Sequence, residues 1–393
     1  MRIAEVETFV VGNPSPGVGG RYFIFVKVTT DSGVVGWGEA YSFPFHPRVV
    51  PALVDDVAER HLLGADPFRI EWLWHRIYGS GYTQRPDTSL MAVLSALETA
   101  CWDIIGKELG RPVYDLLGGK VRERLRSYTY LYSAGPDDPV YTDPDTAAAR
   151  AVAYVEQGFT AVKFDPVAPY TSFDPRQLSL EALDRAERYV KAVRDAVGDR
   201  CDLLFGTHGQ MTPAGALRLA RRLEPYDPLW LEEPTPPESP EEMAKVARGT
   251  SIPIATGERL AGKHEFARVL ATGAASILQP ALGRCGGILE AKKIAAIAEA
   301  HYAQLAPHVY CGPIEAAASI QLDACIPNFL IQESINTFDG FHAELLTEPI
   351  AWEDGYLIAP DRPGIGHELN EAVARAHPYD GDELHFDMHP EPL

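Results

Sequence analysis

The chain has 393 residues, a formal net charge of −20 and 46% hydrophobic residues, enough for a large core divided between two domains. The acidic balance argues against a nucleic-acid partner, because a basic face is what neutralises phosphates. No apolar run approaches the length of a membrane span and residues 1–6 lack a signal-peptide pattern, so we expect no membrane partner. The five cysteines have no ligand-like spacing, which predicts free buried thiols and a cytoplasmic location.

Residues 1–124 predict an α+β domain. Segments 2–11, 21–29 and 34–39 are typical of a strand meander, with a turn at 31–33. One face of the second strand is expected to carry Tyr22, Ile24, Val26 and Val28. Helical patterns follow at 48–62, 67–78 and 89–106.

From residue 125 the pattern changes to short apolar runs alternating with helical segments, which predicts a parallel α/β barrel. The expected strands are 128–133, 161–165, 204–209, 229–234, 252–258, 276–280, 304–308 and 329–333. Beyond residue 349 we expect loops and one short helix over 370–376.

Two barrel strands end in carboxylates at an equal spacing. Glu232 and Glu258 lie 26 residues apart, and Gly206 precedes Glu232 by the same interval. The tips of successive parallel strands meet at one mouth, and carboxylates there are ligands that Mg²⁺ prefers. The alternative is that both glutamates form ion pairs, with Lys163 or Arg259 as partners.

Several motifs occur together and in order along nearly the whole chain. They are GWGE (36–39), ALETACWDIIGK (96–107), LLGG (116–119), EEP (232–234), TGER (256–259), APH (306–308) and QE (332–333). This set resembles the mandelate racemase branch of the enolase superfamily, and within it the sugar-acid dehydratases of the galactonate dehydratase type. The resemblance implies a modified TIM barrel, (β/α)7β, over 125–348. It also implies a capping domain over 1–124, completed by a returning C-terminal segment over 349–393, and a homo-oligomer that uses Mg²⁺.

The same resemblance implies roles for four polar residues at the barrel mouth. His308 would remove the proton α to the substrate carboxylate, and His208 would protonate the departing β-hydroxyl. Lys163 would act as a base on the other face, as in the racemases, or pair with the substrate carboxylate. Glu333 would hydrogen-bond the enediolate oxygen if it is protonated, which a crowd of carboxylates favours.

The chain departs from the family pattern at two positions. Gly206 stands where the first acidic metal ligand is expected, and Ala281 stands where an Asp would orient His308. Asp165, on the neighbouring strand, is our candidate for the third ligand; otherwise water completes the site. A backbone carbonyl or Glu333 is expected to orient His308 instead.

Loops that cover the barrel mouth in the family carry the expected substrate-binding residues. They are Arg21, His46, Tyr82, Arg85 and Tyr310, although ordinary exposed loop residues would look the same. The leading hypothesis is a dehydratase that converts a sugar acid to a 2-keto-3-deoxy acid. A racemase, epimerase or lactone cycloisomerase is the first alternative. A barrel impaired by the changes at Gly206 and Ala281 is the second.

Overall fold

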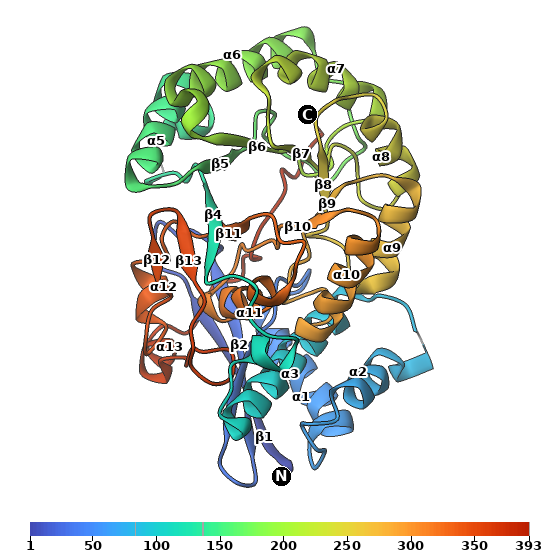
Figure 1. The fold of residues 1–393 in the computed structure, drawn as a ribbon, viewed down its shortest axis with the longest axis vertical. Helices are drawn as coiled ribbons and strands as arrows, with labels where there is room; N and C mark the ends of the chain where they lie inside the picture. Colours follow the sequence, from blue (N-terminus) through green and yellow to red (C-terminus); the bar gives the residue numbers. More distant parts are fainter. Residues whose placement is uncertain (83, 136, 393) are drawn as a thin grey trace.

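The computed structural model describes residues 1–82, 84–135 and 137–392, which form a capping domain beside a barrel (Figure 1). The capping elements are β1 (Ile3–Gly12), β2 (Tyr22–Thr30), β3 (Val35–Glu39), η1 (Pro47–Val49), α1 (Val50–Val57), η2 (Ala58–Leu62), α2 (Ile70–Tyr78), η3 (Ser80–Tyr82), α3 (Thr88–Leu109) and α4 (Val113–Leu116). The three strands form an antiparallel sheet in the order β1-β2-β3, so the expected meander is confirmed.

Strand β2 lies between two apolar cores because its side chains alternate between the faces of the sheet. Ile24 and Val26 belong to the core under the capping helices, whereas Phe23 and Phe25 belong to the core shared with the barrel. The capping domain is therefore joined to the barrel by a buried sheet face. The residue limits of 124 and 348 between the domains stay predictions.

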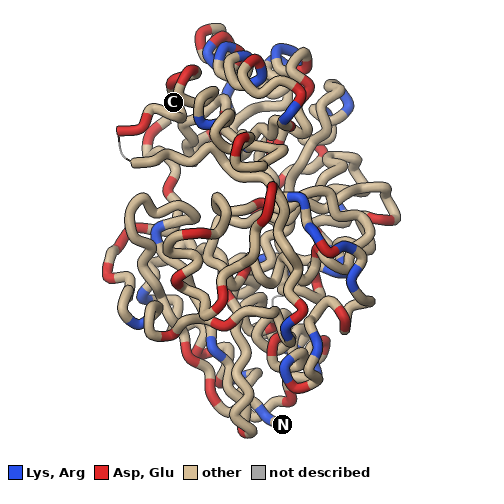
Figure 2. The backbone as a smooth tube through the Cα atoms, turned by 60° about the vertical axis from the view of Figure 1, so that its left-hand side comes forward, with Lys and Arg blue, Asp and Glu red and all other residues tan. Residues whose placement is uncertain are grey.

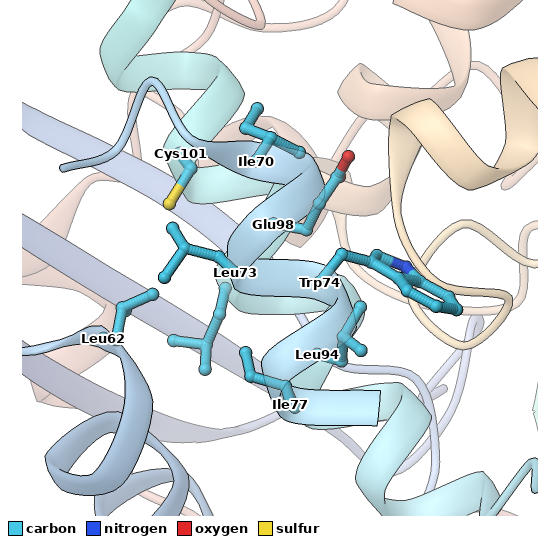
Figure 3. A pocket seen from close by; sticks show the side chains of 9 residues that line it. Leu62, Ile70, Leu73, Trp74, Ile77, Leu94, Glu98 and Cys101 are labelled. Carbon is cyan, nitrogen blue, oxygen red and sulfur yellow. The ribbon is translucent and has the colours of Figure 1, made fainter. Parts of the chain in front are cut away.

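Helix α3 is the centre of the capping domain. Asp87 caps its N-terminus by accepting hydrogen bonds from two backbone amides, and Gly110, with a φ of 64°, ends it. Among the helices of the described residues, α3 alone is long and apolar enough to cross a membrane, but 83% of that window is buried inside the protein. It is a core helix. Between α2 and α3 lies a small pocket with eight apolar lining residues and Glu98 (Figure 3).

This pocket is not a substrate site, because its one carboxylate is already satisfied. Glu98 accepts hydrogen bonds from the backbone amides of Ile288 and Leu289, at 2.7 and 3.0 Å. The contact connects α3 to the barrel, and the rest of the pocket is ordinary apolar packing.

The barrel follows the (β/α)7β pattern that the sequence predicts. Its elements are β4 (Arg124–Tyr130), η4 (Pro139–Tyr141), α5 (Pro144–Gln157), β5 (Ala161–Phe164), α6 (Leu180–Val197), η5 (Gly198–Arg200), β6 (Asp202–Gly206), α7 (Pro213–Leu223), η6 (Glu224–Tyr226), β7 (Trp230–Glu232), α8 (Pro240–Ala247), β8 (Ile254–Thr256), α9 (Gly262–Thr272), β9 (Ile277–Leu278), α10 (Ile288–Ala300), β10 (Gln304–Leu305), α11 (Pro313–Cys325) and β11 (Gln332–Ser334). Strands β4 to β10 pair in parallel in chain order. The ring closes because β11 pairs with β4 and Leu305 bridges Phe329.

The C-terminal segment has the short helix expected over 370–376, but it also has a strand hairpin where we expect loops. It contains α12 (Phe341–Glu344), β12 (Trp352–Glu353), β13 (Tyr356–Ile358) and α13 (Glu371–Ala376). Strands β12 and β13 form a hairpin, and β13 pairs antiparallel with β4. Asp354 and Gly355 at the turn have φ angles of 47° and 84°, which is the geometry that an Asp-Gly turn favours. This pairing explains why β4 starts at Arg124 instead of at the predicted residue 128.

One layer of side chains fills the barrel interior, with one residue from each strand or its immediate extension. The layer consists of Tyr128, Ala161, Leu204, Trp230, Ala255, Ile277, Ala306 and Ile331. Outside the barrel, acidic and basic residues are interspersed along the helices (Figure 2).

Candidate active site

The polar side chains of the site form a second layer next to the interior layer, closer to the C-terminal ends of the strands. Side chains two residues apart on a strand share a face, so the residues that follow the interior layer by two also point into the barrel. They are Lys163, Glu232, Gln279, His308 and Glu333, and all five are buried. Gly257, with a φ of 146°, interrupts the alternation on β8, and Glu258 reaches the same group.

Lys163 forms the central ion pair of the site. Its Nζ lies 2.6 Å from Oε1 of Glu232 and 3.6 Å from Oε1 of Glu333. Oε2 of Glu232 accepts hydrogen bonds from Gln279 at 2.7 Å and Trp230 at 3.0 Å. Burial alone would lower the pKa of Lys163, but the two carboxylates outweigh it and raise that pKa. Lys163 is therefore a fixed ammonium, and Glu232 has the ion-pair partner considered as the alternative to a metal.

Carboxylates hold His308 on one side and a tyrosine holds it on the other. Its Nδ1 lies 2.9 Å from Oε2 of Glu333 and 3.4 Å from Oε2 of Glu258. Its Nε2 lies 3.1 Å from the hydroxyl of Tyr41. Burial would lower the pKa of His308, but Glu258 and Glu333 raise it to about 9.

Glu333 is the acidic side chain that orients His308, because Ala281 has no side-chain acceptor. Ala281 bridges His308 through the backbone, while Oε2 of Glu333 lies 2.9 Å from Nδ1 of His308 and accepts a hydrogen bond from the amide of Val309 at 3.0 Å. Burial would raise the pKa of Glu333, but Lys163 and His308 lower it to about 2. The expectation of a protonated Glu333 is therefore wrong for this arrangement, because two cations surround it.

Asp165 occupies the space of the missing side chain at position 206. A Cβ added to Gly206 would lie 2.0 Å from Oδ1 of Asp165, and Oδ2 lies 3.5 Å from Nδ1 of His208. Burial raises the pKa of Asp165, although His208 and Lys163 oppose the shift. The carboxylate thus points toward β6, as expected. Its ion-pair partner is His208.

The loop after β6 holds His208 in a fixed backbone conformation. The hydroxyl of Thr207 donates to the carbonyls of Glu232 and Glu233, at 2.7 and 2.8 Å. His208 and Gly209 then have φ angles of 47° and 70°, in the left-handed region. His208 and His308 follow β6 and β10, which are four strands apart in an eight-stranded ring, so they lie on opposite sides of the mouth.

The carboxylates expected to hold a divalent cation are not gathered around one point. Within the described residues, no three His, Cys, Asp or Glu side chains are close enough together to hold a metal ion. However, Oδ1 of Asp165 and Oε2 of Glu258 are buried without a hydrogen-bond partner. Such oxygens are the hard donors that Mg²⁺ takes. The donor types fit, and Glu232 would join them after releasing Lys163.

The predicted substrate-binding residues fall into two groups. Tyr310 lies beside the barrel mouth, with its ring 6.4 Å from that of Phe386. Arg21 pairs with Asp387, at 2.8 Å, on the C-terminal tail. The other three, His46, Tyr82 and Arg85, have no contact with the barrel carboxylates among the described contacts. His46 accepts a hydrogen bond from the amide of Arg48, Arg85 is exposed, and Tyr82 is 98% exposed.

Sequence reasoning missed Tyr41, Gln279 and the C-terminal tail. Gln279 lies at the tip of a predicted strand, two residues after Ile277, so the strand period could have found it. Tyr41 follows the GWGE motif by two residues, but its contact with His308 spans 267 positions. No local pattern marks such a contact.

Comparisons with known proteins agree with this fold. Residues 13–118 match the mandelate racemase / muconate lactonizing enzyme N-terminal domain, and residues 146–373 match the enolase C-terminal domain-like family. The D-galactonate dehydratase of Ralstonia nicotianae is 39% identical over 357 residues, which cover 89% of this chain and 90% of that protein.

Solved structures give the same result. A protein from Labrenzia alexandrii of the mandelate racemase / muconate lactonizing enzyme type is 64% identical, with a TM-score of 0.98. The match covers 100% of this chain and 99% of that one. A mandelate racemase / muconate lactonizing enzyme from Sulfitobacter sp. is 52% identical, with a TM-score of 0.97, covering 100% and 99% of the two chains.

A capping domain over a (β/α)7β barrel with buried carboxylates at its mouth defines an enzyme of the enolase superfamily. The chain belongs to the mandelate racemase / muconate lactonizing enzyme family of that superfamily. Enzymes of the superfamily generally use Mg²⁺. The fold, the family and the enzyme class expected from the sequence are thus confirmed.

Proposed function

We propose that the protein is a Mg²⁺-dependent dehydratase that converts a sugar acid to a 2-keto-3-deoxy acid through an enediolate. The observation that carries the proposal is a pair of histidines on opposite strands, each with its own carboxylate. His208 lies beside Asp165, and His308 lies beside Glu333. Elimination needs a base for the α-proton and an acid for the departing hydroxyl, and two separate histidines can supply one each. The curated relatives named D-galactonate dehydratase support the same reaction class.

In the first step, His308 accepts the proton α to the substrate carboxylate. It must be neutral to do so, whereas Glu258 and Glu333 favour its cationic form in the structure. Their negative charge must therefore be neutralised when the site is filled. Mg²⁺ held by Glu232, Glu258 and Asp165 would do this and would stabilise the negative charge that develops on the substrate carboxylate.

In the second step, the C–O bond at the β-carbon breaks and the hydroxyl leaves as water with a proton from His208. Oδ2 of Asp165 lies 3.5 Å from Nδ1 of His208, so it would orient the ring that donates this proton. The resulting enol then tautomerises, since carbon 3 takes up a proton and the enol hydroxyl releases one, which gives the 2-keto-3-deoxy acid. Atoms balance, since the reaction removes one water and needs no oxidant.

The charge of Lys163 favours this proposal over the racemase alternative. A racemase would need Lys163 as a neutral base on the second face. Its contacts with Glu232 and Glu333 keep it an ammonium, which suits pairing with the substrate carboxylate. The impaired-barrel alternative loses support because Asp165 and Glu333 stand in for the acids absent at Gly206 and Ala281.

The proposal includes a cytoplasmic location and a homo-oligomer. All five cysteines are buried free thiols, which suits a reducing compartment. The oligomer rests on the resemblance to the family.

The test is a screen of aldonates and aldarates with Mg²⁺ in D₂O, following keto-acid formation and α-deuteration by NMR. We expect His308→Asn to lose both signals. We expect His208→Asn to keep α-deuteration and lose keto acid. His301→Asn, at an exposed position after α10, is the matched control and should behave as wild type. Exchange without keto acid in the wild type would favour the isomerase, and no reaction would favour the impaired barrel.

A further inference from the structure

The C-terminal tail, residues 377–392, leaves the capping domain and crosses the barrel mouth (Figure 1). At its start, the amide of Tyr379 donates to the carbonyl of Val10 in β1. At its end, the amide of His389 donates to the carbonyl of Tyr170 at 2.7 Å, in the loop between β5 and α6. Thr171, in the same loop, donates through its hydroxyl to the carbonyl of Glu391 at 2.9 Å. The tail therefore bridges the capping domain and the barrel.

His385 anchors the middle of the tail. Its Nδ1 and Nε2 each lie 2.9 Å from a backbone carbonyl oxygen, of Tyr22 and Tyr310 respectively. The backbone at Gly20 makes room for the ring: a Cβ there would lie 2.0 Å from Cε1 of His385. The loop before β2 and the tail are thus fitted to each other.

Arg21 adds a charged anchor on the same side. Its guanidinium donates to the carbonyl of Leu384 and to the carboxylate of Asp387, both at 2.8 Å. It also lies 3.3 Å from Glu383. Arg21, expected from the sequence to bind substrate, instead has three partners in the tail.

Two consecutive tail residues connect to the two histidines of the site. The ring of Phe386 lies 6.3 Å from that of His208, with 18° between their planes. The ring of His385 lies 5.6 Å from that of Tyr41, whose hydroxyl contacts Nε2 of His308. The tail thus borders both sides of the mouth.

We infer that the C-terminal tail forms the wall of the active site beside His208, and that Phe386 is a specificity-determining residue for the sugar chain. This inference rests on the proposed function for the substrate class. In the proposed function, the cation held by the buried carboxylates and the ammonium of Lys163 would fix the acid end of the substrate, and His208 would reach the β-carbon. Phe386 lies against His208, so it borders the carbons beyond. Its apolar ring limits chain length there and keeps bulk water from the proton that His208 donates.

The first test compares Phe386→Ala with wild type on aldonates of increasing length. We expect KM for the preferred acid to rise roughly tenfold with a smaller change in kcat, because a packing contact distant from the reacting atoms is lost. In Phe386→Ala, kcat/KM for longer acids should rise relative to kcat/KM for shorter ones. Phe386→Tyr should restore the wild-type order of preference among the acids. Phe68→Ala is the matched control, since Phe68 is 44% exposed and Phe386 46% exposed. An unchanged length profile would overturn the inference.

The second test does not need a known substrate. Diethyl pyrocarbonate modifies accessible histidines, and mass spectrometry locates the product at His208. We expect the rate at His208 to rise several-fold in Phe386→Ala and to stay at the wild-type value in Phe68→Ala. Faster modification of His208 in Phe386→Ala, without dehydration of any acid by the wild type, would support the position of the tail beside His208. It would count against the proposed function. An unchanged rate of modification at His208 would overturn the inference that the tail forms the wall beside it, whether or not the enzyme is active.

Discussion

Oδ1 of Asp165 lies 2.0 Å from the point that a Cβ on Gly206 would occupy, so the two residues share one position between β5 and β6. A side chain at 206 and the observed carboxylate cannot both be present without a shift. An acidic side chain at 206 and the observed one at 165 would therefore compete for the same space. The carboxylate of Asp165 fills the space that a side chain at 206 would need.

The first prediction concerns Mg²⁺ binding. Replacing Asp165 with Asn should lower the affinity for Mg²⁺ at least roughly tenfold, because a charged ligand becomes neutral. Isothermal calorimetry measures this directly. Asp202→Asn is the control, because Asp202 lies at the opposite end of β6 and pairs with Arg126 at 2.6 Å. Equal affinity in wild type and Asp165→Asn would remove Asp165 from the ligand set.

A double substitution sharpens this test. Gly206→Asp alone should impair folding or binding, because its Cβ meets Asp165. Combined with Asp165→Ala, it should recover Mg²⁺ binding, since an acid then stands at position 206, where the family resemblance implies one. Failure of the double variant to bind better than Asp165→Ala would show that the two positions are not equivalent.

The second prediction concerns Lys163. Lys163→Ala leaves the buried carboxylates of Glu232 and Glu333 without their cation, which costs about 3–5 kcal/mol of unfolding free energy in EDTA. Saturating Mg²⁺ should recover more stability in this variant than in wild type, because Lys163 no longer competes for Glu232. Denaturant unfolding with and without Mg²⁺ measures both effects.

Lys191→Ala provides the baseline for this comparison. Lys191 forms an exposed pair with Asp195, and such pairs contribute little to stability. If Lys163→Ala loses the same stability with and without Mg²⁺, then Lys163 and the cation do not share Glu232.

The strand period accounts for what the sequence could predict at the site. Lys163, Glu232, His308 and Glu333 all lie at the tips of predicted strands, and the order of parallel strands brings them to one mouth. The strand period does not distinguish a Glu232 that binds a metal from a Glu232 that pairs with Lys163, because the side chain points into the barrel in either case. That choice depends on side-chain distances near 3 Å, which a one-dimensional pattern does not contain.

The tail was beyond prediction for another physical reason. His385 contacts Tyr22 across 363 residues, and the segment around it has neither strand nor helix periodicity. Its position depends on two carbonyl oxygens and on the space at Gly20. The hairpin of β12 and β13, by contrast, carries an Asp-Gly turn that sequence analysis could have used.

The third prediction is a pH dependence of the tail. Burial lowers the pKa of His385 to about 4, although its two carbonyl partners oppose the shift, and Arg284 and His308 lower the pKa further. The unfolded chain binds the proton near pH 6.5 and the folded chain does not. The stabilisation is therefore complete above pH 6.5 and is lost as the pH falls from 6.5 toward 4.

Hydrogen exchange of a peptide covering residues 384–391, corrected for the intrinsic rate, should become faster at pH 5 than at pH 7.5. A local readout is needed because burial also lowers the pKa of His342 and His367 to about 4, which affects global stability. His385→Asn should exchange fast at both pH values. Equal protection of the wild-type tail at pH 5 and 7.5 would contradict the account.

The fourth prediction concerns how β3 is held against α3. A Cβ on Gly38 would lie 1.9 Å from the carbonyl oxygen of Ala96, so Gly38→Ala must push the strand off the helix. We expect a loss on the order of 1–3 kcal/mol or more, measured by denaturant unfolding. Activity should fall as well, because β3 leads directly to Tyr41 beside His308. Gly135→Ala is the control, since nothing lies within 4 Å of a Cβ there. Equal stability of the two variants would mean that the close approach of β3 and α3 is not required.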